Sequence, residues 1–368
     1  MSLRLKILFC AVVILSAACK NDTGSLHLFD ANLEGEHKHV ITLQTDTSHI
    51  GMYLKEIAKD KLIFASKDNH YNYILYQLQK DSAIYLGHFL PCGRGPYEIN
   101  IPEIGYDPHK DLLTIYAPYN FENKLFYIPF DNYKNLFTPS TWRQSSLPHV
   151  PSRTGMEFIN NSAILMLNGN KENKFFSVAY MGRDKYYKCL DLPYPPLNED
   201  ISSFKKSILF SGLLKKQPEG DTYLYSSSSS KLSFIFNIAN DSIKNLTYLS
   251  NILPVISIDA NGKDYTRAAD TEDGCAYLDV TNAYIYIGYN NATLEEVRNS
   301  APFREGYPFY FFDRINVFDW KGNFIKRLVL DKPIANFVVT PDDSAIYAST
   351  FGFSGELVTD DIVRIDLQ

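Results

Sequence analysis

The sequence predicts an all-β fold, a six-bladed β-propeller, from three observations. A pair of short apolar strands recurs six times along the chain, at a spacing of about fifty residues. Tyr (26) and Phe (24) are abundant, and aromatic side chains suit the half-buried surface of a pleated sheet. The chain has 368 residues, more than the ~250–300 that one compact core usually supports, whereas a ring of repeats divides its core among its units.

Each repeat contributes two recognisable strands. The first strands are expected at 62–66, 112–118, 163–169, 222–226, 283–289 and 345–350. The second strands are expected at 73–78, 124–130, 175–181, 231–238, 314–320 and 361–367. A unit of this size cannot bury its apolar face alone, so each unit must pack on its neighbours around the ring.

The last unit has one strand too few for a four-stranded blade. It supplies strands only at 337–340, 345–350 and 362–367. A ring must also hide its open strand edges. Residues 40–43 form a short apolar strand that has no partner of its own, so we expect this N-terminal strand to complete the last blade and close the ring.

The first nineteen residues predict export and a lipid anchor. A positively charged start is followed by an apolar run at 7–15, which is too short to span a bilayer that needs ~20 helical residues. Small residues at 16–18 then precede Cys19. This resembles a bacterial lipobox, in which the cysteine is acylated and becomes the mature N-terminus, although the apolar run ends one position early. An ordinary secretory signal cut after Ala18 is the alternative.

These features divide the chain into three expected parts. Residues 1–18 are the signal peptide, 19–38 a lipidated tether, and 39–368 the six-bladed propeller domain. The expected location is the cell envelope, as an outer-membrane lipoprotein that faces either the periplasm or the outside. The membrane is then a partner through the lipid on Cys19.

Charge and cysteine content narrow the possible partners and chemistry. The formal net charge is −6, and the lysine pairs at 205–206 and 215–216 are isolated, so no concentrated basic face exists for nucleic acid. Cys92, Cys189 and Cys275 remain after the anchor, which allows one disulfide at most. We expect three inert thiols.

The fifth unit carries the largest insertion, between residues 290 and 312. Thr293 and Glu296 have the spacing of a capping box, so a short helix is expected to begin there. Insertions in repeat proteins gather on one face, often the face that binds. A plain connecting loop is the equal alternative.

No catalytic motif and no metal motif is present. The patterns HExxH, CxxC and G-x-S-x-G are all missing. All eight histidines precede residue 150, so the later blades cannot supply a histidine site. His37 and His39 alternate and could share a metal with a distant carboxylate, but solvated side chains are the more common outcome. We therefore expect no catalytic residue, no metal and no cofactor.

The most specific local motif is Gly93-Arg94-Gly95-Pro96-Tyr97-Glu98, which lies between the first and second blades. Two glycines and a proline indicate a tight, rigid path with room for positive φ. Arg94 and Glu98 are the candidate ligand-binding residues, because a guanidinium offers donors in a fork that suits planar anions. Alternatively, Arg94 pairs with Glu98 or another acid and only fixes the blade junction.

With this motif, the stretch 314–333 (RINVFDWKGNFIKRLVLDKP) and the lipobox, the chain resembles the TolB-like six-bladed β-propeller lipoproteins of Bacteroidetes. Tyr97 stands where members often carry glycine. The resemblance covers essentially the whole mature chain and implies the fold and the outer-membrane location. It implies no activity, so no catalytic residue is carried over.

Two functions remain open. The first is a non-catalytic recognition module that binds a peptide, a glycan or a protein partner on one propeller face. The second is a metal-dependent lactonase- or lyase-like enzyme with carboxylates in the central channel, to which Glu56, Glu103 and Glu157 could contribute. The lack of any catalytic constellation favours the binder, so we expect that the chain is not an enzyme.

Overall fold

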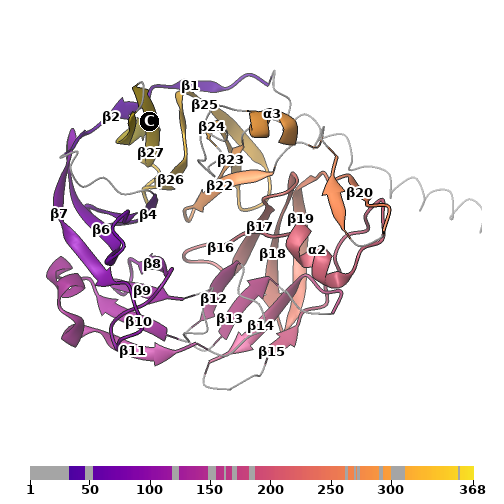
Figure 1. Cartoon of the computed structure of the whole chain (residues 1–368), viewed down its shortest axis with the longest axis horizontal. Coiled ribbons are helices and arrows are strands. Elements are labelled where there is room, and N and C mark those ends of the chain that lie inside the picture. The colour runs from indigo at the N-terminus through magenta and orange to yellow at the C-terminus, as the bar shows by residue number, and fades with distance from the viewer. Residues whose placement is uncertain are drawn as a thin grey trace, which may run out of the picture.

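The computed structural model describes residues 33–45, 53–117, 124–147, 155–160, 163–167, 172–181, 187–261, 264–268, 271, 274–289, 293–299, 311–354 and 357–368. The described strands form six blades arranged in a ring, which confirms the predicted propeller (Figure 1). No helix among the described residues is long and apolar enough to cross a membrane.

The first three blades follow one another along the chain, each from its innermost strand outward. Blade 1 consists of β4 (Leu54–Ala58), β5 (Lys61–Ala65), β6 (Tyr71–Gln79) and β7 (Ser82–Pro91). Blade 2 consists of β8 (Glu103–Asp107), β9 (Leu112–Tyr116), β10 (Lys124–Pro129) and β11 (Arg143–Ser146), with the short 3-10 helices η3 (Tyr133–Phe137) and η4 (Pro139–Thr141) before β11. Blade 3 consists of β12 (Met156–Asn160), β13 (Ala163–Leu167), β14 (Phe176–Tyr180) and β15 (Tyr187–Cys189).

The second half of the ring adds the insertions. Helix α2 (Ser203–Leu209) precedes blade 4, which consists of β16 (Gly212–Lys216), β17 (Thr222–Ser227), β18 (Leu232–Ala239) and β19 (Ser242–Asn251). A separate hairpin follows, made of β20 (Ile256–Ile258) and β21 (Tyr265–Arg267). Blade 5 consists of β22 (Cys275–Val280), β23 (Tyr284–Tyr289), β24 (Phe312–Asp319) and β25 (Phe324–Ile334), with α3 (Leu294–Asn299) between β23 and β24. Blade 6 contains β26 (Asn336–Val339), β27 (Ala345–Ser354) and β28 (Leu357–Asp366).

The N-terminal strand closes the ring, as predicted. Strand β2 (Ile41–Thr42) pairs antiparallel with β28 and is the fourth strand of blade 6. The same segment does more than predicted, because β1 (Glu36–Lys38) pairs parallel with β25 of blade 5 and β3 (Gln44–Thr45) pairs parallel with β7 of blade 1. Residues 36–45, called the N-terminal belt below, thus join three consecutive blades, and regular structure begins within the segment expected to be tether.

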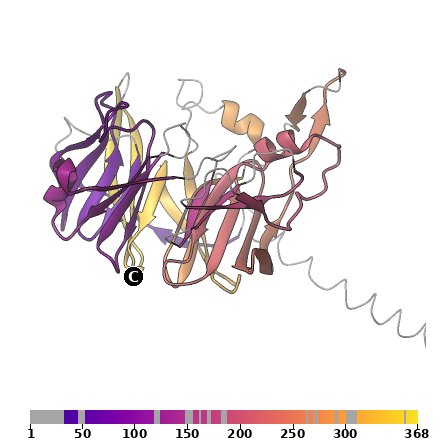
Figure 2. The same ribbon diagram turned by 90° about the horizontal axis from the view of Figure 1, so that it is seen from below.

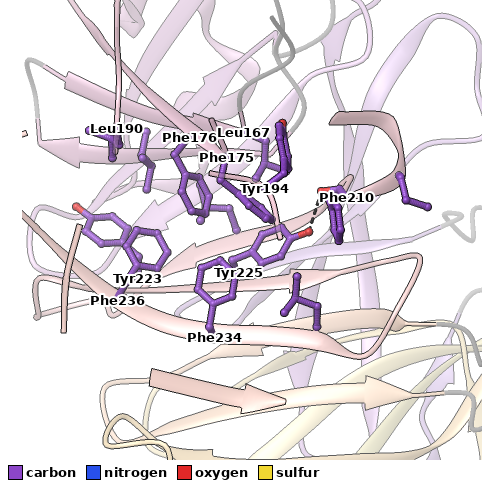
Figure 3. Close-up of a cluster of buried hydrophobic side chains, with 14 of the residues drawn as sticks. Leu167, Phe175, Phe176, Leu190, Tyr194, Phe210, Tyr223, Tyr225, Phe234 and Phe236 are labelled. Atoms are coloured by element: carbon purple, nitrogen blue, oxygen red, sulfur yellow. Dashed lines mark hydrogen bonds between the residues drawn. The ribbon is translucent and has the colours of Figure 1, made fainter. Parts of the chain in front are cut away.

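The blades are held together by apolar side chains packed between neighbouring sheets. The largest such cluster lies between blades 3 and 4 and is rich in aromatic rings (Figure 3). Phe175 meets Tyr225 edge-on with 4.7 Å between ring centroids, and Phe176 stacks on Phe236 at 4.9 Å. The buried hydroxyl of Tyr225 donates to the carbonyl oxygen of Phe210 at 2.7 Å. The abundance of Tyr and Phe thus serves the packing between blades.

Helices α2 and α3 and the hairpin β20–β21 lie on one face of the ring. In each blade the innermost strand begins on the face of the ring at which the preceding blade ends. The connection between the second and third strands of the blade lies on that same face. This face, called the loop face below, therefore carries α2, α3, the hairpin β20–β21 and the linkers between blades, and Figure 2 shows the helices and the hairpin on the side of the ring away from the C-terminus. The predicted capping box is confirmed: the backbone N–H of Thr293 donates to Glu296 Oε2 at 2.7 Å, and that of Glu296 to Thr293 Oγ1 at 3.2 Å.

Candidate functional site

The innermost strand of each blade, which precedes the two strands expected from the sequence, lies next to the central channel. Strands β4 and β8, β12 and β16, β16 and β22, β22 and β26, and β26 and β4 contact one another around the axis. Glu56, Glu103 and Glu157, the three acids considered from sequence, lie on β4, β8 and β12. They are therefore channel residues of blades 1, 2 and 3.

Three channel acids connect one blade to the next. Glu56 Oε2 accepts the backbone N–H of Tyr106 on β8 at 3.1 Å, and Asp279 Oδ2 on β22 accepts that of Val339 on β26 at 2.8 Å. Glu157 on β12 accepts the backbone N–H of Lys216 on β16. The acids stand on blades 1, 3 and 5, so each one links its blade to the following blade, and the pattern repeats every second blade.

One lysine side chain interacts electrostatically with all three acids. Lys215 on β16 lies 3.7 Å (Nζ to Oδ1) from Asp279. Burial lowers the pKa of Lys215, but Asp279 and Tyr277, then Glu56 and Glu157, favour its charged form and raise the pKa overall. The side chain of Lys215 stays 39% exposed and that of Asp279 13%, because both face the channel, so the cost of desolvation is smaller than in a packed interior.

Three of the channel carboxyl groups have pKa values above the ordinary values of Asp and Glu. Burial raises the pKa of Glu56 to about 7 and that of Glu157 to about 7, although Lys215 lowers both in part. Burial raises the pKa of Asp279 as well, against the opposing effect of Lys215. Three carboxyls share one cation here, so the group as a whole holds protons more readily than surface acids do.

The channel acids make structural contacts within and between the blades. Both oxygens of Glu56 accept backbone N–H groups, since Oε1 takes that of Ile57 at 2.9 Å. Glu103 instead pairs with Lys55, 3.2 Å from Nζ to Oε2. Among the residues that the structure describes, no three His, Cys, Asp or Glu side chains are grouped to hold a metal ion. The acids considered for a lactonase-like site are thus divided between blade contacts and an ion pair.

The other titratable candidates from the sequence are two histidines and three cysteines. His39 pairs through Nδ1 with Asp331 Oδ2, whereas the side chain of His37 is exposed. Within the described residues, Cys92, Cys189 and Cys275 form no disulfide bond. Burial raises the pKa of Cys275 to about 12, so this thiol stays protonated at neutral pH, in line with the expectation of inert cysteines.

The glycines of the loop 93–98 make room for a carboxylate. Gly93 has φ +148°, and a Cβ built on it would lie 2.2 Å from Glu98 Oε2. A Cβ on Gly95 would lie 2.8 Å from Glu98 Cδ, and the backbone N–H of Gly95 donates to Glu98 Oε2 at 2.7 Å. Glu98, which the sequence offered as a ligand contact, therefore folds back over its own loop and holds it closed.

A lysine from the next blade fixes the same loop. Lys124 Nζ donates to the carbonyl oxygens of Gly95 and Glu98, each at 2.6 Å. Asn100 Nδ2 donates to the carbonyl oxygen of Gly93 at 3.0 Å. Sequence reasoning missed Lys124, which stands at the start of a predicted strand with nothing nearby to suggest contact with a loop thirty residues earlier.

Arg94 is the exposed polar side chain of this loop. Within the described part of the chain, its guanidinium has no hydrogen bond and no ion pair, since Glu98 is engaged by Gly95 instead. Tyr97 is also exposed, with its ring edge-on to Trp142 at 6.1 Å. The loop thus presents an exposed cation and an aromatic ring on a backbone held by several hydrogen bonds.

The linker that contains this loop is strained at its end. Ile101 has φ +48°, a conformation that β-branched residues rarely adopt, and its side chain is largely exposed. Such strain collects at binding and catalytic sites, where the surrounding contacts hold it in place. Two residues later β8 begins at Glu103, so the linker ends at the mouth of the channel.

Exposed apolar side chains collect on the loop face. Among the described residues, four large apolar side chains are more than half exposed: Ile101, Phe204, Ile208 and Val255, at 51% to 64%. All four lie in linkers between blades, on the face that carries α2, α3 and the hairpin β20–β21. The loop face, which also carries Arg94, is therefore the candidate functional surface.

A match to one family model supports the architecture. A family model described as "TolB-like 6-blade propeller-like" matches residues 35–342. A "Putative exported protein" from Bacteroides fragilis NCTC 9343 has 13% identity and a TM-score of 0.47, over 90% of this chain and 95% of that one. The β-propeller domain of Cps50 (Swd1) from Myceliophteria thermophila has 10% identity and a TM-score of 0.43, over 88% of this chain and 99% of that one. No curated protein matches the chain.

Proposed function

Since the chain belongs to the TolB-like six-bladed propeller family, we propose that it is a non-catalytic recognition module that binds a peptide, a glycan or a protein on its loop face. The ring serves as a rigid support, and the linkers between blades carry the contacts. This division is the usual one, because propeller folds host many functions in the loops of one face.

One observation carries the proposal: the loop 93–98 is held in a fixed shape while Arg94 is left without a partner among the described residues. A loop ordered before binding loses little entropy when a ligand arrives. An unpaired guanidinium pairs well with a carboxylate or a similar planar anion. Exposed Tyr97 and Ile101 add apolar contact beside it.

We further propose that the protein is exported and held in the cell envelope by a lipid on Cys19. Support comes from the apolar run at 7–15 and the small residues before the cysteine. A lipid-anchored ring would present its loop face to soluble or surface-bound ligands near the outer membrane.

The experiment is a binding screen with the purified chain from residue 20 onward, on arrays of glycans that include uronic acids and on arrays of peptides with free carboxylates. Arg94→Ala should lower binding to any hit by about tenfold or more, with little change in melting temperature. Lys321→Ala, an exposed cation in the β24–β25 turn on the opposite face, is the matched control and should bind like the wild type. Wild-type binding by Arg94→Ala would contradict the proposed site.

A further inference from the structure

The N-terminal belt follows the ring in one direction. Its strands β1, β2 and β3 lie on blades 5, 6 and 1 in that order (Figure 1). Each adds to the outer edge of its blade, so the belt covers three open edges in succession. Followed backward from β1, the same path leads to blade 4.

Blade 4 offers the kind of edge that the belt covers elsewhere. Its outer strand β19 has 10 residues, like β7 with 10 and β25 with 11, whereas β11 has 4 and β15 has 3. The two other long outer strands, β7 and β25, each carry a parallel belt strand. Within the described residues, β19 pairs only with β18. Long unpaired edges are the ones that accept a further strand.

The start of the belt lies close to β19. A methyl group built on Gly322, in the turn before β25, would stand 3.0 Å from Cγ2 of Thr247 on β19. Four residues further along, Lys326 Nζ binds Glu36 Oε2 of β1 at 2.8 Å. Four extended residues span about 13 Å, so the edge of β19 and the beginning of the belt are neighbours.

The chain before the belt has the length and the pattern to continue it. Residues 31–35, which precede β1, could extend over about 17 Å, compared with the ~13 Å spanned by the four residues from Gly322 to Lys326. Leu26, Leu28 and Phe29 are the large apolar residues between positions 20 and 32. In the belt, the buried apolar side chains are Val40 and Leu43, which lie between its strands.

We propose that residues 26–30 of the mature chain add to the outer edge of β19 as a further belt strand, parallel to it. The belt then covers blades 4, 5, 6 and 1. If Cys19 carries the lipid, only residues 20–25 remain between the lipid and blade 4, so the tether holds the ring close to the membrane with blade 4 nearest to it. The tether is thereby an orienting element as well as a spacer.

Hydrogen exchange on the mature chain, isolated from the cell envelope in detergent, tests this. Amides in residues 242–251 should exchange about tenfold more slowly in the wild type than in the double variant Leu26→Asp, Leu28→Asp. The matched control is Ser25→Asp, His27→Asp, which adds the same charge on the other side of an extended chain and should exchange like the wild type. Unchanged exchange in β17 and β18 verifies that blade 4 stays folded in each variant.

Equal exchange of residues 242–251 in all three proteins would overturn the proposal. Protection that persists in Leu26→Asp, Leu28→Asp and grows with protein concentration would overturn it too, because a second copy would then cover the edge. Neither result bears on Arg94 or on the loop face, so this test is independent of the proposed function.

Discussion

Two carboxyl groups in the channel, Glu56 and Glu157, give the folded protein a pH dependence that can be measured. Each has a pKa near 4.5 in the unfolded chain and about 7 in the folded one. The folded protein therefore binds these protons more tightly. Their contribution to stability is fully present below about pH 4.5 and is lost as the pH rises through about 7, by roughly 2–3 kcal/mol for each group.

Urea unfolding at pH 5 and pH 8 checks this. The double variant Glu56→Gln, Glu157→Gln should lose most of the fall in unfolding free energy that the wild type shows between these values. Its stability drops at every pH, because the amide nitrogen of each Gln faces a backbone N–H, so the slope is the readout. Glu199→Gln, at an exposed position, is the control and should keep the wild-type slope. A wild-type slope in the double variant would exclude these two groups as its source.

Gly93 is the residue on which the shape of the 93–98 loop depends most. We expect Gly93→Ala to lower the free energy of unfolding by about 1–3 kcal/mol, because its φ of +148° strains any side chain and its Cβ would displace the Glu98 carboxylate. Gly105→Ala is the matched control, since no atom lies within 4 Å of the Cβ it would add. The denaturant midpoints of the two variants give the comparison, and equal midpoints would show that Glu98 and its loop adapt freely.

For single residues, the sequence predicted the place of a side chain in the ring better than the side chains that it contacts. Glu56, Glu103 and Glu157, offered together from the sequence, all stand on innermost strands. Lys215 and Asp279 were missed, although a lysine in the apolar inner strand of blade 4 was a signal. Which side chains of two inner strands meet depends on how far the blades are offset along the axis, and no local pattern encodes that offset.

Among the elements, the N-terminal belt determines how the ring is held shut. Deleting residues 39–44 removes β2, breaks the link to β3 and uncovers the edges of β28 and β7. We expect a loss of several kcal/mol from a total of ~5–15, seen as a much lower melting temperature. Thr42→Ala, at an exposed belt position, is the control and should change it little. A deletion that melts like the wild type would mean that the ring closes without the belt.

The belt also shows where prediction from sequence stopped. The missing fourth strand of the last unit identified β2, because a blade has a known number of strands. Nothing in that count indicated β1 and β3, since blades 5 and 1 were already complete. Such added strands follow from the path of the chain over the outer edges, which only the assembled ring reveals.

For the whole molecule, the proposed lipid anchor on Cys19 can be tested by one substitution. Cys19→Ser should give an unacylated protein that leaves the membrane fraction, because one apolar run of nine residues does not span a bilayer of ~20. Labelling cells with radioactive palmitate measures this. The matched control is Cys92→Ser, which should be labelled like the wild type. Absence of label from the wild type would mean that the leader is an ordinary secretory signal.

The fold was predictable at this scale because six repeats admit few architectures, whereas the function was not. A propeller does not specify a ligand, and the contacts come from linkers whose side chains follow no repeat. Nothing in the sequence around Phe204, Ile208 and Val255 distinguishes them from buried apolar residues. Their exposure on one face emerges only from the topology of the blades.

The central claim is that the loop face binds and does not catalyse. The most direct measurement is hydrogen exchange of the chain with and without a ligand found on the glycan or peptide arrays, together with mass analysis of that ligand after incubation. We expect slower exchange in residues 92–102 and in linkers of the same face, with the ligand recovered unchanged. Protection confined to the channel strands or to the opposite face, or chemical conversion of the ligand, would contradict it.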